Sequence, residues 1–128
     1  MLRQKFLVLM EKVEYDFDVS VEFINGNNSF WVPTPKEEIE ELTCRGIIDI
    51  GDDQSEFEKL VSLVHEIGHV IFSDGNDLRN HRRIPLFEES LAWYLGYDYA
   101  LKSGVEICLK EYAERVEAAL QLYIKETK

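Results

Sequence analysis

The first third of the chain combines a helical and a strand-like spacing of apolar residues. Near the N-terminus, apolar residues recur at threes and fours, at Leu2, Phe6, Leu9, Met10 and Val13. This spacing predicts an amphipathic helix. Residues 19–24 then alternate as a strand does, and 30–32 form a second short strand. The turn-forming run 25–29 separates them, so we expect a β-hairpin.

A short helix and a third strand are predicted next. Thr34, Pro35 and Glu37 have the order of an N-cap, a first-turn proline and a capping-box glutamate. They predict a short helix that carries apolar residues up to Leu42. Residues 46–50 form an apolar run, which predicts a third strand that leads into the next helix.

The longest predicted helix follows the turn-forming residues 51–53. Asp53 is placed as its N-cap, with Glu56 as the capping-box partner. Apolar residues recur at helical spacing as far as Ile71, and Gly75 can end the helix. Because apolar residues also occupy its other faces, we expect this helix to be buried nearly all round.

Two further helices complete the predicted fold. Pro85 suits a first helical turn and opens a mostly apolar helix, and a final helix is expected from about Glu106 to Lys125. We expect one α+β domain over residues 1–128, in which helices pack against a small, mainly antiparallel three-stranded sheet.

Composition and charge limit the classes of partner. Hydrophobic residues make up 45% of the chain, which is enough for one core. The formal net charge of −11 repels phosphate backbones and anionic lipid surfaces, so we expect neither direct nucleic-acid binding nor membrane binding. The same charge would attract a basic protein substrate.

The sequence also carries signals of compartment and redox state. It has no run of 18 apolar residues and no signal-peptide pattern, so we expect a soluble cytoplasmic protein. Its two cysteines, Cys44 and Cys108, lie far apart in sequence, which favours reduced thiols over a disulfide framework.

The segment His65-Glu66-Ile67-Gly68-His69 carries the candidate chemistry. Two histidines four residues apart on a helix lie one turn apart, so both imidazoles can reach one ion while Glu66 projects beside it. A histidine in an apolar helix is more often a hydrogen-bonded core residue than a ligand. Here the motif lies in a helix that is expected to be buried, and a strand precedes it. Polar side chains in that setting need a partner, so we interpret the motif as a Zn²⁺ site with Glu66 as general base.

A catalytic zinc site needs a third protein ligand. His81 follows His69 by twelve residues (81 − 69), which is too far for the spacing of six in H-E-x-x-H-x-x-G-x-x-H, and its polar loop suits a solvated side chain. Cys44 would follow the example of peptide deformylases, but their Glu-Gly-Cys-Leu-Ser segment is missing. Glu88 and Glu89, in the first turn of the helix after Pro85, are the better candidates.

With these residues the chain resembles the ImmA/IrrE family of small zinc peptidases. In that family a histidine pair on one helix is followed by a variable loop and then by Glu-x-x-Ala, an apolar residue and a small residue. Glu89-Ser90-Leu91-Ala92, with Leu95 and Gly96, fits this pattern. The resemblance therefore favours Glu89 over Glu88 as third ligand. It covers roughly residues 47 to 100.

One departure concerns the residue that supports a ligand histidine. In larger zinc peptidases an aspartate often stands four residues after the glutamate ligand, whereas here that position is Trp93. Asp74, Asp98 or a backbone carbonyl remain as candidates for this support.

The resemblance implies a zinc endopeptidase that cuts a protein partner, for example a transcriptional regulator. In such hydrolases the strand beside the active helix binds extended substrate by β-augmentation, and either 30–32 or 47–50 is a candidate for that strand. The alternative is a non-enzymatic protein-binding module that zinc stabilises. Glu66 favours the enzyme, because a structural site has no need of a carboxylate beside its ligands.

Overall fold

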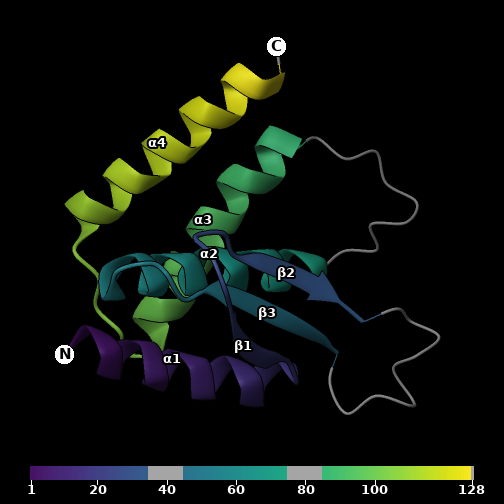
Figure 1. Cartoon of the computed structure of the whole chain (residues 1–128), viewed down its shortest axis with the longest axis vertical. Helices are drawn as coiled ribbons and strands as arrows, with labels where there is room; N and C mark the ends of the chain where they lie inside the picture. Colours follow the sequence, from purple (N-terminus) through teal and green to yellow (C-terminus); the bar gives the residue numbers. More distant parts are fainter. Residues whose placement is uncertain (35–44, 75–84, 128) are drawn as a thin grey trace.

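A computed structural model describes residues 1–34, 45–74 and 85–127 of the chain. In these ranges, one helix is followed by three strands and then by three helices (Figure 1). The short helix expected between Thr34 and Leu42 falls largely outside the described residues, as do Cys44 and His81.

The sheet is built around its last strand. Strands β1 (Ser20–Ile24), β2 (Phe30–Pro33) and β3 (Gly46–Gly51) lie in the order β1-β3-β2. β3 runs parallel to β1 and antiparallel to β2. The α+β class and the three strands were predicted and are confirmed, but the sheet is mixed rather than mainly antiparallel.

The predicted hairpin between β1 and β2 is wrong, because β3 lies between these two strands. Ile48 and Ile50 of β3 are fully buried, and a strand with so much apolar surface belongs at the centre of a sheet. The turn-forming residues between β1 and β2 therefore hold the end of β3 instead. Ser29 accepts a hydrogen bond from the Gly51 amide (3.3 Å), and the Gly26 carbonyl accepts one from the Asp53 amide, just after β3.

Helix α2 (Glu56–Asp74) begins two residues later than its predicted cap implied. The Ser55 hydroxyl accepts a hydrogen bond from the Glu58 amide (3.2 Å), so Ser55 is the N-cap and Glu58 occupies the third helical position. The predicted pair Asp53 and Glu56 is wrong for a physical reason. The Asp53 amide is already bonded to the β1–β2 loop (3.0 Å), which keeps this residue in the turn.

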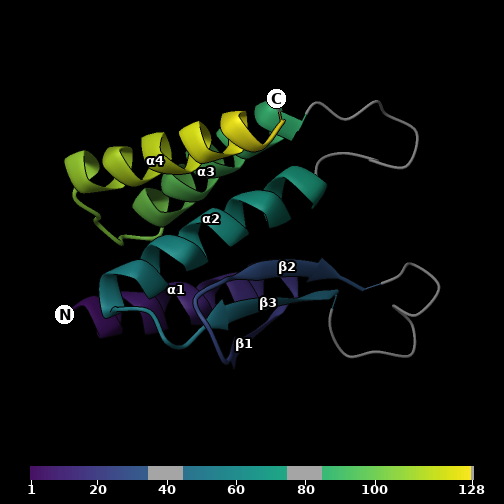
Figure 2. The ribbon, with the colours of Figure 1, turned by 45° about the horizontal axis from the view of Figure 1, so that its top comes forward.

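Helix α2 is the centre of the molecule. The sheet and α1 (Leu2–Phe17) lie on one side of α2, and α3 (Pro85–Lys102) and α4 (Leu109–Thr127) lie on the other (Figure 2). The expectation that α2 is buried nearly all round is confirmed, because no residue from 57 to 73 is exposed, and the buried residues Val61 and Val70 lie on opposite faces of the helix. Such burial fixes the helix from both sides, which is what a rigid site requires.

The remaining predicted features are close to the structure. Helix α4 begins at Leu109, three residues after the expected start, and Ile107 just before it is buried in the core. Cys108 is a free and exposed thiol. Among the described residues, no helix combines the length and the apolar character that a membrane span requires.

Helices α2 and α3 cross with their backbones in direct contact. A Cβ atom at Gly68 would overlap the carbonyl oxygen of Ala92, and one at Gly96 would overlap the carbonyl oxygen of Val64. Glycine at these two positions therefore lets the helix axes approach more closely than ordinary side chains permit. This close crossing brings the first turn of α3 over the histidine face of α2.

We expect Gly68→Ala to separate α2 from α3. Because the new methyl group meets backbone atoms, which cannot rotate away, the free energy of unfolding should fall by about 3 kcal/mol. Urea denaturation measures this change. Ala118→Ser, which adds one atom at an exposed position of α4, is the control and should leave stability unchanged. Equal stability of Gly68→Ala and wild type would contradict the close crossing.

Candidate metal centre

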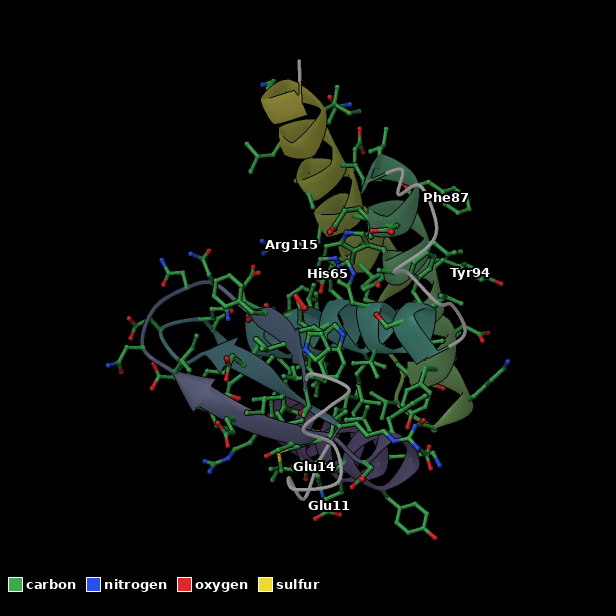
Figure 3. The ribbon with its side chains drawn as sticks, turned by 90° about the vertical axis from the view of Figure 1, so that its right-hand side faces the viewer. Glu11, Glu14, His65, Phe87, Tyr94 and Arg115 are labelled. Atoms are coloured by element: carbon green, nitrogen blue, oxygen red, sulfur yellow. The ribbon has the colours of Figure 1, made fainter. Side chains whose placement is uncertain are left out.

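Three side chains from two helices converge where α2 crosses α3. His65 and His69 come from successive turns of α2, and Glu89 comes from the first turns of α3. The Nε2 atom of His65 lies 2.9 Å from one carboxylate oxygen of Glu89, and that of His69 lies 3.1 Å from the other. The two Nε2 atoms are 3.2 Å apart. Figure 3 shows His65 projecting from α2 toward the side where α3 and α4 lie.

This arrangement has the dimensions of a site for one metal ion. Two atoms bound about 2 Å from one tetrahedral ion lie about 3.3 Å apart, and the two Nε2 atoms, at 3.2 Å, are close to that value, while each Nε2 atom lies near a different oxygen of Glu89. Ligand atoms of all three side chains lie within 4.8 Å of one another. Two imidazoles and a carboxylate are a donor set that zinc accepts, with one position left for water or substrate. The group can therefore hold a metal ion.

Of the two adjacent glutamates, Glu89 is the one that reaches both histidines. Glu88 precedes it by one residue, which on a helix turns the side chain by about 100° away from the same face. Among the described residues, the group that could hold a metal ion thus contains Glu89 and not Glu88. His81 and Cys44, the other ligand candidates, lie outside the described residues.

Trp93 stands four residues after Glu89, at the position where larger zinc peptidases often have an aspartate that supports a ligand histidine. Its indole ring stacks on the imidazole of His65, with ring centres 4.0 Å apart and an angle of 5° between the planes. Asp98, one candidate for the support, instead pairs with Lys102 (2.9 Å). The side chain of Asp74 is outside the described part of the chain. His65 is therefore oriented by stacking on one face, a role that the sequence pattern did not reveal.

The electrostatics of the cluster suit cation binding. Burial would raise the pKa of Glu89, but its hydrogen bonds with His65 and His69 outweigh this effect and hold the pKa at about 2. Glu89 is therefore ionised at neutral pH, as a carboxylate ligand must be. Burial lowers the pKa of His65 and thus favours the neutral imidazole that binds metals.

His69 differs from His65 because three carboxylates, rather than one, act to raise its pKa. Burial lowers its pKa, but the hydrogen bond with Glu89 and the nearby carboxylates of Glu66, Glu89 and Glu88 outweigh this, so the pKa is raised. A raised pKa makes metal binding compete with protonation of this ring, so affinity for the metal falls as the solution is acidified.

Glu66 is the buried charged residue beside this group, with 6% of its surface exposed. One of its oxygens lies 3.8 Å from Nδ1 of His65, so it is next to the cluster without belonging to the three converging side chains. Burial raises the pKa of Glu66 to about 7. A carboxyl group with this pKa can both accept and return a proton near neutral pH.

Comparison with family models, curated proteins and solved structures gives no match for this chain. The functional argument therefore depends on the site itself.

We expect purified protein to bind about one zinc ion per chain, because the described residues contain one His2Glu group. Alanine substitution of His65, His69 or Glu89 should lower zinc affinity by at least about 100-fold, as measured by competition with a chromogenic chelator. Glu88→Ala is the matched control, since it removes a neighbouring carboxylate of the same helix. A larger loss of zinc affinity in Glu88→Ala than in Glu89→Ala would show that Glu88, and not Glu89, is the third ligand.

The buried carboxyl group of Glu66 should make the stability of the metal-free protein depend on pH. Its pKa is about 7 in the folded state against 4.5 in the unfolded state, so the folded state binds the proton more tightly. Stability is thus lost as the pH rises from 4.5 to 7, and the full loss persists above 7.

Glutamine cannot ionise, so Glu66→Gln should be increasingly more stable than wild type across this range. The difference should grow by about 3 kcal/mol between pH 4.5 and pH 8. Urea denaturation in the presence of a chelator measures it. A difference that is the same at both pH values would show that Glu66 is not buried as described.

Proposed function

We propose that this protein is a zinc-dependent endopeptidase that hydrolyses a peptide bond in a protein partner. One observation carries the proposal: His65, His69 and Glu89 converge from two helices at metal-binding separations, with Glu66 buried beside them. A site that only stabilises the fold gains nothing from a fourth side chain at this place, the buried carboxyl group of Glu66.

Four residues of the chain would have two separate roles in hydrolysis, metal binding and proton transfer. His65, His69 and Glu89 would hold the ion, and Glu66 would accept a proton from the attacking water and donate it to the leaving amine. When bound, zinc supplies a water of pKa about 7 and polarises the substrate carbonyl. The pKa of about 7 for Glu66 supports this role, because such a group exchanges protons readily at neutral pH.

The substrate is proposed to bind as an extended segment along β2. Ile47–Ile50 is ruled out as the added edge, because β3 is paired on both sides. Within the described residues β2 pairs with β3 alone, which leaves its other edge for an extended peptide. Phe30 and Val32 of β2 are each 50% exposed, so apolar side chains are available beside that edge.

The resemblance to the ImmA/IrrE peptidases and the net charge narrow the proposed substrate. A chain of net charge −11 attracts basic proteins, and small regulators that bind DNA are typically basic. We therefore propose a basic protein, such as a transcriptional regulator, as the substrate class.

The test separates hydrolysis from zinc binding. Zinc-loaded protein is incubated with a library of peptides and unfolded proteins, and new N-termini are counted by mass spectrometry. Wild type should generate them at defined positions. Glu66→Gln should retain zinc but lose about 100-fold or more in rate, because it can hold the water without removing its proton.

Two outcomes would refute the enzyme. Equal cleavage by wild type and Glu66→Gln would remove Glu66 from the reaction. No cleavage by a protein that binds zinc stoichiometrically and releases a bound partner intact would favour the zinc-stabilised binding module.

A further inference from the structure

An open apolar groove runs between α3 and α4, next to the metal centre. Its volume is about 560 Å³. The two helices that form its walls lie side by side on the same side of α2 (Figures 1 and 2). Nothing in the proposed hydrolysis requires this groove, so it needs an explanation of its own.

The wall from α4 has the spacing of a helix-packing surface. Lining residues recur at threes and fours along the whole helix, at Leu109, Ala113, Val116, Leu120 and Ile124. This is the pattern of a face that packs against another helix. Fifteen residues of helix span about 22 Å, so the groove is long enough for about four turns of a docked helix.

The wall from α3 is aromatic and offers few polar groups. Trp93, Tyr94 and Tyr97 line it at helical spacing, together with Ser90. Three hydroxyl groups in the groove are already bonded to backbone carbonyls: Ser90 to Leu86, Tyr97 to Ile107, and Tyr112 to Trp93. A polar small molecule would therefore find little to bind, whereas apolar side chains of a partner would be buried favourably.

Charge indicates which kind of helix fits. Glu117 is the one formally charged side chain among the residues that line the groove. The whole chain has a net charge of −11, so a second copy would be repelled and a basic partner attracted. We propose that the groove between α3 and α4 docks an amphipathic helix of a protein partner, with basic residues flanking its apolar face.

Trp93 connects this groove with the metal centre. Its indole lines the groove, and the same ring stacks on His65. A partner helix docked here lies one aromatic ring away from the candidate metal ligand. The groove would thus anchor a substrate or regulator beside the site, and this use of the groove rests on the proposed peptidase function. The docking of the partner helix itself does not rest on that function.

The probe is a synthetic amphipathic peptide of about 18 residues, with leucines at helical spacing on one face and lysines and arginines on both flanks. A peptide of the same composition with scattered leucines is the first control, and a version with glutamates in place of the basic residues is the second. Isothermal titration calorimetry with the full chain gives the affinities. The basic amphipathic peptide should bind at least about 10-fold more tightly than either control.

Two matched pairs of variants locate the binding. Ala113 lines the groove and Ala118 does not, yet both are exposed on α4, so Ala113→Arg and Ala118→Arg carry the same charge. Leu109 and Leu122 are 63% and 59% exposed, but only Leu109 lines the groove, so Leu109→Gln and Leu122→Gln form the second pair. The groove variant of each pair should weaken binding by about 10-fold, and its partner by less than about twofold.

Three results would overturn the proposal. Equal binding of the scattered peptide, or equal weakening by both members of a pair, would mean attraction by charge alone. A concentration-dependent dimer that Ala113→Arg dissociates would assign the groove to a second copy of the chain.

The titrations are repeated with zinc-loaded Glu66→Gln protein. We expect this variant to bind the basic amphipathic peptide with unchanged affinity, so a failure of hydrolysis and a failure of docking remain distinguishable.

Discussion

The backbone contact between α2 and α3 is the constraint on which the rest of the structure depends. Gly68 lies inside the histidine motif itself, between the two histidines in sequence, and leaves room for the carbonyl oxygen of Ala92. Gly96 makes the reciprocal contact one turn further along α3. Glu89 meets both histidines only because the helices approach this closely, so the glycines determine the site as much as the side chains that would bind the ion.

The parts of the fold that could be predicted from the sequence are those that local spacing determines. The presence of the helices α2 and α3 and the position of His65 and His69 on α2 follow from periodicity within one segment. The partner of each element does not, because it depends on contacts between distant segments. The β1–β2 hairpin failed for this reason: five turn-forming residues fit a hairpin as well as a loop that crosses the end of β3. The cap of α2 failed likewise, since the Asp53 amide is used by a distant loop.

At the site, the histidine pair and the choice of helix for the third carboxylate could be predicted, whereas the role of Trp93 could not. A tryptophan at this spacing is ordinarily a core residue, and the sequence contains nothing that places its ring against His65. Stacking fixes the plane of the imidazole without a further carboxylate, which limits the negative charge around a group that contains Glu89 and has Glu66 beside it. The same indole faces the groove, so packing there and ligand geometry are physically coupled.

The central position of β3 has a consequence for how the chain folds. β1 and β2 precede β3 and pair with it rather than with each other, and a long connection separates β2 from its antiparallel neighbour β3, so no tight hairpin nucleates the sheet. Every rung of the sheet joins residues that are separated in sequence, and closing such loops slows folding relative to local pairing. During synthesis, β1 and β2 therefore have no strand to pair with until β3 has left the ribosome. α1, which needs no partner strand, is the element that can form first.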